Sequence, residues 1–289
     1  MTSTLDAAQD LTPGARPIWA SMPEDSLVFV GNATVILRVG GITILTDPNF
    51  LHRGERVGLG YGLTSVRVRE PALGIDELPP IDLVLLSHLH EDHFDRVAEE
   101  RLARDVPILT TPQAARELGR RGFAAATGLD PWDSRAVAGS DERVRITALP
   151  GRHGPGVLAA LLPDVMGSLI ELTDARGPTE VRRRIYITGD TLVFEGIDEI
   201  GRRVPSIDLA LLHLGGTRVM GITLTMDGAA GVRLLQKVPA SRVIPIHVDD
   251  YEVFTSPLTD FLSAAEQAGV GGRVRVVERG EIMPLFPEA

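Results

Sequence analysis

The chain has 289 residues, of which 44% are hydrophobic and 24% are charged, and 29 basic residues against 39 acidic ones give a net charge of −10. This composition excludes a disordered protein, and the excess of acidic residues argues against a nucleic-acid partner. The chain has no cysteine, which excludes disulfides and every metal site that requires thiolate ligands.

The first 25 residues have no basic start followed by an apolar run, and they contain several Pro and Asp residues. We expect residues 1–25 to form a flexible arm rather than a secretory signal. No stretch approaches the roughly 20 apolar residues of a membrane-spanning helix. The sequence therefore predicts a cytoplasmic protein without a membrane span and with one folded domain over residues 26–289, and it leaves a homo-oligomer open.

Short β-like segments and helical segments alternate along this domain. Strands are predicted at 27–30, 34–39, 42–46, 83–86, 107–110, 143–149, 168–172, 185–188, 209–212, 243–246 and 274–277. Helices are predicted at 95–103, 112–121, 226–237 and 257–268. Residues 50–80 lose this periodicity, and we expect them to form an irregular insert. The chain begins with strands and then twice alternates strands and helices. This order of elements favours an α/β protein with a four-layer αββα sandwich.

Three of the seven histidines lie directly after the apolar segment 83–86, in the sequence Ser-His-Leu-His-Glu-Asp-His. Side chains at positions i and i+2 of an extended chain point the same way, so His88 and His90 can reach one ion together. Asp92 and His93 follow at the turn into the next helix and can face a second ion. Imidazole and carboxylate ligands suit zinc, manganese or iron. The segment therefore predicts a metal site.

The H-x-H-x-D-H pattern resembles the signature of the metallo-β-lactamase-fold hydrolases. Later segments match the rest of that family's pattern, with His153 in Pro-Gly-Arg-His-Gly, Asp190 in Thr-Gly-Asp-Thr and His247 after an apolar segment. Asp47, in Thr-Asp-Pro, resembles the Asp that ends an early strand of the family. The resemblance covers about residues 27–284 and implies the metallo-β-lactamase fold, which is an αββα sandwich.

The resemblance also implies a role for each of these residues. The ligands of one ion would be His88, His90 and His153, those of a second ion would be Asp92, His93 and His247, and Asp190 would bridge the two. Two divalent ions, zinc first with manganese or iron as alternatives, would lower the pKa of a shared water to near ~7. Asp92 would orient the resulting hydroxide and accept its proton, and Asp47 would hold a ligand imidazole in place.

The function implied by this resemblance is hydrolysis of a small ester, lactone or phosphodiester, which can be anionic, by a metal-bridging hydroxide. Segments 31–34, 45–48 and 208–216 resemble the branch that contains ascorbate-phosphate lactonases and N-acyl-phosphatidylethanolamine phospholipase D. A mononuclear iron dioxygenase on the same fold and a non-catalytic metal-binding protein are the alternatives. The presence of Asp92, His93 and His247 favours two metals over the mononuclear enzyme.

Three further features bear on specificity. His213 ends a predicted strand. As a functional residue it would protonate a leaving alkoxide or hold a phosphate. The alternative is a structural histidine that is hydrogen-bonded beneath the site. Residues 50–70 could form a lid that brings guanidinium groups to an anionic substrate, although loop arginines are more often solvated. The arginines of this lid would be Arg53, Arg56, Arg67 and Arg69. Segment 156–166 could form an apolar lip for an acyl chain, or it packs in the core.

Overall fold

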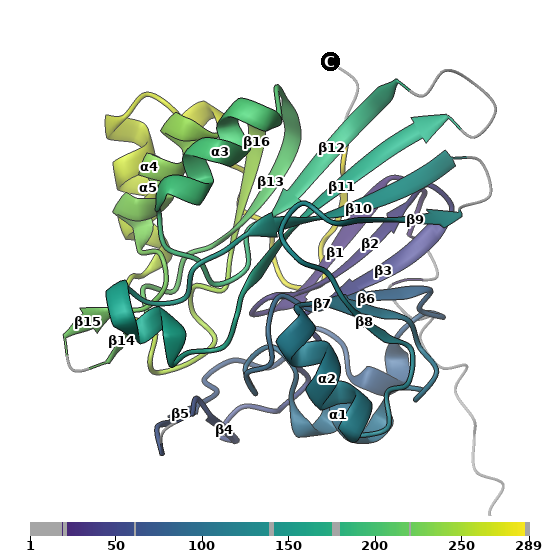
Figure 1. Ribbon diagram of the computed structural model, residues 1–289. Coiled ribbons are helices and arrows are strands. Elements are labelled where there is room, and N and C mark those ends of the chain that lie inside the picture. The colour runs from purple at the N-terminus through teal and green to yellow at the C-terminus, as the bar shows by residue number, and fades with distance from the viewer. Residues whose placement is uncertain are drawn as a thin grey trace, which may run out of the picture.

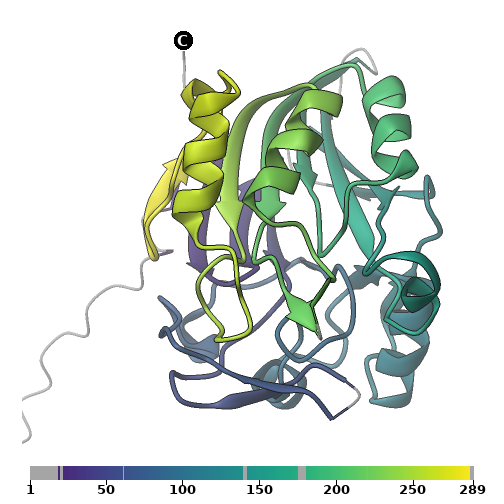
Figure 2. The same cartoon turned by 90° about the vertical axis from the view of Figure 1, so that its left-hand side faces the viewer.

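The computed structural model describes residues 19, 22–60, 62–138, 142–174, 180–219 and 221–286. Two β-sheets pack face to face, and helices cover both outer faces (Figure 1; Figure 2). The first sheet has the order β17-β1-β2-β3-β6-β7-β8, and the second has the order β16-β13-β12-β11-β10-β9. The predicted αββα sandwich is therefore confirmed.

The bounds of the elements are as follows. The first sheet contains β1 (Ser26–Gly31), β2 (Thr34–Val39), β3 (Ile42–Thr46), β6 (Leu83–Leu85), β7 (Ile108–Thr110), β8 (Ala126–Gly128) and β17 (Ile282–Pro284). The second sheet contains β9 (Ser134–Ala138), β10 (Glu142–Pro150), β11 (Met166–Asp174), β12 (Val181–Ile187), β13 (Ile207–His213) and β16 (Ala240–Ile246). Two small hairpins lie outside the sheets, β4 (Arg56–Gly58) with β5 (Thr64–Val66) and β14 (Arg218–Val219) with β15 (Ile222–Thr223).

Five α-helices and three short 3-10 turns complete the described part of the chain. The helices are α1 (Arg96–Arg101), α2 (Pro112–Arg120), α3 (Glu195–Arg203), α4 (Gly228–Lys237) and α5 (Leu258–Gln267). The 3-10 turns are η2 (Ile75–Glu77), η3 (Gly156–Ala160) and η4 (Gly271–Arg273). Helices α1 and α2 cover the first sheet, and α3, α4 and α5 cover the second, as Figure 1 shows.

The alternation of side chains along the strands builds the layers. In β1, Leu27 and Phe29 point into the core between the sheets, whereas Val28 and Val30 point toward α1 and α2. In β13, Leu209 belongs to the core between the sheets, whereas Ala210 points to the other face and packs under α3, α4 and α5. Because both faces of these strands are buried, their sequences are continuous apolar runs. Because of these apolar runs, the strands could be predicted from the sequence.

All four predicted helices and ten of the eleven predicted strands are confirmed. The strand expected at 274–277 is wrong: Val274 makes only an isolated bridge to Val243 in β16 of the second sheet, and the last strand of the described chain is β17, which pairs with β1 in the first sheet. Helix α3 and strands β8 and β9 were not predicted. The insert at 50–80 is less irregular than expected, since it contains the β4–β5 hairpin and η2.

At the N-terminus, residues 1–18 of the predicted arm lie outside the described residues. Met22 is buried in the core beneath the first sheet, and its carbonyl accepts a hydrogen bond from Arg38. Packed structure therefore begins a few residues before position 26. In the described part of the chain, no helix is both long and apolar enough to cross a lipid bilayer.

Candidate metal centre

The predicted ligands lie at one edge of the sandwich, where strands from both sheets end. Asp47 follows β3, the segment 87–93 follows β6, His153 follows β10, Asp190 follows β12, and His247 follows β16. Side chains that follow the carboxyl ends of such strands meet at the same edge of an α/β fold. Residues separated by up to 200 positions in sequence thus lie at one edge of the fold, and the structure brings the predicted ligands close to one another there.

One group of donors consists of His88, His90 and His153. The Nε2 atom of His88 lies 3.1 Å from Nδ1 of His90. The Nδ1–H group of His153 donates a hydrogen bond of 3.0 Å to the carbonyl of Leu224, which directs Nε2 of that ring away from the backbone. Three imidazoles whose free nitrogens converge are a ligand set for a divalent cation.

A second group of donors adjoins the first and consists of Asp92, His93, Asp190 and His247. Asp190 lies 3.4 Å from Nε2 of His93 and 3.4 Å from Nδ1 of His247. Asp92 lies 3.5 Å from Nε2 of His247. These separations are longer than direct hydrogen bonds but suit atoms that share a cation.

The orphaned atoms of this group test whether a metal fits. Oδ1 of Asp92, Nε2 of His93, Oδ1 of Asp190 and both ring nitrogens of His247 are buried and have no hydrogen-bond partner. Buried polar atoms are otherwise almost always paired, because an unpaired one costs roughly 1–3 kcal/mol. Unpaired nitrogen and oxygen atoms that converge on one point are typical of the ligand atoms of a metal ion. The residues present therefore fit divalent cations.

The electrostatics differ between the two groups. Burial lowers the pKa of His90 to about 4 and that of His88 well below its ordinary value, and neighbouring imidazoles add to the effect on His88. Burial opposes a charge on His93 as well, but Asp190 and Asp92 outweigh it and raise its pKa well above the ordinary value. The first group thus offers neutral imidazoles, and the second holds carboxylates that require a cation.

Asp47 and His213 lie beneath the two groups. Asp47 accepts hydrogen bonds from the backbone and hydroxyl of Ser87 and lies 3.1 Å from Nδ1 of His93. Although burial opposes its charge, His93 and His213 lower the pKa of Asp47 to about 2. His213 is fully buried, with Nε2 facing Asp47 at 3.5 Å and Nδ1 next to the hydroxyl of Thr188. The side chain of His213 is therefore a neighbour of Asp47, and it does not line the cavity described below.

Asn32 was not predicted as a site residue, yet it joins two of the ligands. Its side-chain amide donates to the backbone carbonyl of Asp92, and its backbone carbonyl accepts from the backbone N–H of His247. Asn32, Asp47 and His247 are three of the five described non-glycine residues with a positive φ angle. Strained backbone of this kind concentrates at functional sites. Only its place in the Gly-Asn-Ala-Thr segment pointed to Asn32 in the sequence.

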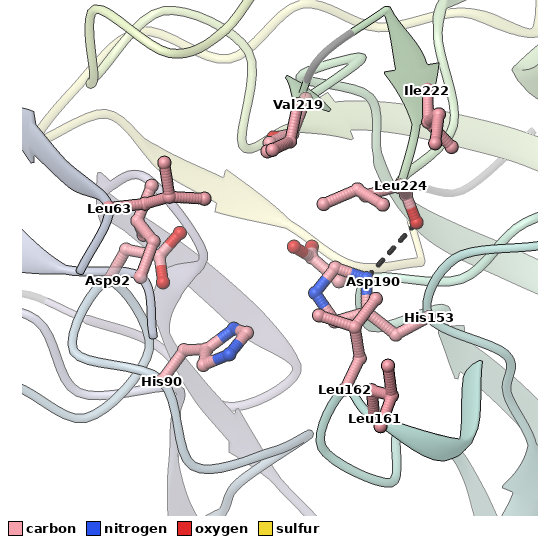
Figure 3. A pocket seen from close by; sticks show the side chains of 12 residues that line it. Leu63, His90, Asp92, His153, Leu161, Leu162, Asp190, Val219, Ile222 and Leu224 are labelled. Carbon is pink, nitrogen blue, oxygen red and sulfur yellow. Dashed lines mark hydrogen bonds between the residues drawn. The ribbon is translucent and has the colours of Figure 1, made fainter. Parts of the chain in front are cut away.

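The metal centre opens into a cavity of about 250 Å³ (Figure 3). His90, Asp92, His153 and Asp190 line its floor. Its walls come from the β4–β5 hairpin, the chain after η3 and the β14–β15 hairpin, and they consist of Thr217 and of Leu59, Leu63, Leu161, Leu162, Val219, Ile222 and Leu224. The predicted apolar lip at 156–166 therefore contributes two leucines to this cavity.

The insert does not bring arginines to this cavity, and the lid interpretation needs correction. Arg67 is completely buried, and its guanidinium donates to Asn49, to the carbonyl of Leu51 and to Asp250. Arg69 is paired with Asp249 on the surface. A buried guanidinium needs carbonyl and carboxylate partners of this kind, so Arg67 anchors the insert from within. The insert presents leucines to the cavity instead.

The chain is similar in sequence to several known proteins. A family model described as the beta-lactamase superfamily domain matches residues 43–248. The UPF0173 protein YddR of Bacillus subtilis is 24% identical over 264 residues, which cover 89% of this chain and 98% of that protein. A UPF0173 metal-dependent hydrolase of Pelotomaculum thermopropionicum is 30% identical over 209 residues, which cover 71% of this chain and 82% of that protein.

The fold also resembles that of a solved structure. An isothiocyanate hydrolase from Delia radicum gut bacteria superposes with a TM-score of 0.75 at 21% identity, over 89% of this chain and 98% of that one. At this identity the likeness shows the fold alone. Together with the donor groups, the relatives support a metal-dependent hydrolase. The chain belongs to the beta-lactamase superfamily and has the metallo-β-lactamase fold.

Proposed function

We propose that the protein is a dinuclear metal-dependent hydrolase of small esters, lactones or phosphodiesters. The observation that carries the proposal is the pair of ligand groups, one of three histidines and one of four residues whose buried atoms include five without a hydrogen-bond partner. His88, His90 and His153 would hold one divalent ion, and Asp92, His93 and His247 the other. Asp190 lies 3.4 Å from ring nitrogens of His93 and His247 and lines the same cavity as His90 and His153, so it would be the ligand that both ions share. Zinc is the first choice for this cysteine-free set, with manganese or iron as alternatives.

Two divalent ions bound there would supply a hydroxide at neutral pH and polarise the substrate oxygen. In ester hydrolysis the oxygen of one water joins the acyl carbon, the ester C–O bond breaks, and a proton reaches the departing alkoxide. Asp92 lines the cavity floor and has an unpaired carboxylate oxygen, Oδ1, that can accept the proton of the attacking water. Asp47 would keep the imidazole of His93 in its ligand orientation, since it faces Nδ1 of that ring.

Elemental analysis of protein purified without chelator is expected to give about two zinc or manganese ions per chain, because two complete donor groups are present. His153→Ala removes one imidazole from the first group only, and its metal content should fall to about one ion. His52→Ala is the matched control, since His52 is an exposed histidine paired with Glu70 outside the site. It should keep two ions.

Other results would favour the alternatives. One iron per parent chain would indicate the mononuclear dioxygenase. Two bound metals without turnover would indicate a non-catalytic metal-binding protein. The panel for turnover contains aryl esters, lactones, bis-aryl phosphodiesters and, because a protein of the same fold acts on that class, an isothiocyanate. An unchanged metal content in His153→Ala would contradict the ligand assignment.

A variant of His213 distinguishes a positioning role of this residue from a role as general acid. Complete burial beneath Asp47 favours positioning, so we expect His213→Asn to lower kcat/KM by a similar factor, about tenfold, for good and poor leaving groups. The measurement is a series of phenyl esters whose leaving groups differ in pKa. A loss confined to the poor leaving groups would instead assign His213 as the proton donor to the alkoxide.

A further inference from the structure

The mouth of the metal-centre cavity is surrounded by exposed apolar side chains. The described residues include four large hydrophobic side chains that are exposed, namely Leu63 at 39%, Val68 at 36%, Leu161 at 59% and Ile222 at 40%. Three of them, all except Val68, line this one cavity. Single exposed apolar residues are ordinary, but a set gathered around one opening indicates a binding surface.

These three side chains come from separate parts of the chain. Leu63 lies between β4 and β5, Leu161 follows η3, and Ile222 lies in β15. In Figure 3 they stand on different sides of the opening, and Asp190 lies between them. We name this set of three, together with Leu59, Leu162 and Val219, the apolar rim. The rim is continuous with the floor that carries the metal donors, since the same cavity contains both.

The cavity wall carries no compensating positive charge. Among its described lining residues there is neither lysine nor arginine, and every ionisable side chain belongs to the floor. A second cavity shares His90, Leu161 and Leu162 with this one. Its arginines are Arg116, Arg120 and Arg121, of which Arg120 and Arg121 are paired with Glu117, and none of the three lines the cavity of the metal centre. A charged end of a substrate would lose its hydration at the rim without gaining a partner.

We propose that the substrate carries a neutral apolar acyl or alkyl group, which the apolar rim binds while the scissile bond lies over the donors of the floor. This assignment rests on the proposed hydrolase function and narrows its substrate class. Because the rim encloses a concave cavity that leads to the metal donors, its occupant is a group attached to the scissile bond. A flat protein or membrane contact would not reach the floor.

Binding of a neutral apolar probe tests the rim separately from turnover. Fluorescence titration with N-phenyl-1-naphthylamine should show saturable binding to the metal-loaded protein. The double variant Leu63→Gln/Ile222→Gln should bind it about tenfold more weakly, since two apolar contacts are lost at residues whose exposure makes the change tolerable to folding. Val68→Gln is the matched control, an equally exposed apolar residue outside the cavity, and should bind as the parent does.

A series of p-nitrophenyl esters from acetate to hexanoate tests the substrate class. We expect kcat/KM of the parent and of Val68→Gln to rise by about threefold for each added methylene. In Leu63→Gln/Ile222→Gln the ratio of hexanoate to acetate should fall several-fold. A matched ester that ends in a carboxylate should be hydrolysed at least tenfold less efficiently than the hexanoate.

The outcomes distinguish the two proposals. If the probe binds as expected but nothing in the ester, lactone and phosphodiester panel is hydrolysed, the apolar site is supported and the hydrolase function is overturned. If esters are hydrolysed but hexanoate is no better than acetate, the apolar substrate class is wrong and the hydrolase stands. Preference for the carboxylate ester, or activity only on lipid vesicles, would also overturn the assignment.

Discussion

Asp92→Asn is expected to lower kcat by about 10³-fold on every substrate that the protein hydrolyses, because Asp92 serves the attacking water rather than any one leaving group. Its carboxylate lines the cavity floor, and Oδ1 has no partner among the described residues. The amide of asparagine has the same shape but cannot accept the proton. Burial opposes ionisation of Asp92, but His93 and His247 outweigh it and lower its pKa, so the carboxylate is available as a base.

The measurement requires metal content beside kcat, since Asp92 is also a proposed ligand. Excess zinc or manganese should restore the metal content of Asp92→Asn without restoring kcat. Glu91→Gln is the control, because Glu91 is the adjacent acidic residue but is exposed and contacts the backbone of Gly58. It should keep kcat within about twofold. Parent-like kcat in Asp92→Asn would refute the mechanism.

The elements that sequence reasoning located are those whose patterns are local. A strand buried on both faces, such as β6 or β13, is a continuous apolar run whatever its neighbours are. Helix α1 is capped by Asp95, whose side chain accepts a hydrogen bond from the backbone of Ala98, and this capping residue is visible in the sequence. The H-x-H-x-D-H segment likewise carries four predicted ligands within six residues.

The elements that were missed or misplaced depend on distant partners. Helix α3 contains Gly196 and Gly201, which weaken a helical pattern. A Cβ at Gly201 would collide with the carbonyl of Lys237 at the end of α4, so close packing between helices requires this glycine. The alternating segment 274–277 reads as a strand, but the chain leaves the sheet after one bridge and turns at Gly280 to form β17.

In the site, too, local sequence patterns could be recognised, whereas features that depend on distant residues could not. Each predicted ligand could be identified from its own short segment, whereas the walls of the cavity could not. Leu63 and Ile222 line the same cavity only after the two sheets have packed, and nothing in their local sequences relates them. Arg67 illustrates the opposite error, because a loop arginine reads as solvated or substrate-binding until its partner Asp250, 183 residues away, is known.

Asp250 connects three distant segments to the metal centre. Its carboxylate accepts hydrogen bonds from Arg67 at 3.2 Å, from both terminal nitrogens of Arg279 at 2.8 and 2.9 Å, and from the backbone of Asn32 at 2.7 Å. Asn32 in turn holds the backbone of Asp92 and of His247. One buried carboxylate thus fixes the insert that carries part of the apolar rim and two ligand-bearing segments.

Asp250→Ala is expected to lower the free energy of unfolding by about 3–5 kcal/mol, because it leaves the buried guanidinium of Arg67 without its counter-charge. Asp249→Ala is the matched control: Asp249 is also paired with Arg279, but it is 38% exposed, so it should cost less than about 1 kcal/mol. Urea denaturation of both variants measures the difference. Metal affinity of Asp250→Ala should fall as well, since Asn32 loses the bond that orients it. Equal stability of the two variants would show that solvent, and not Asp250, compensates the charge of Arg67.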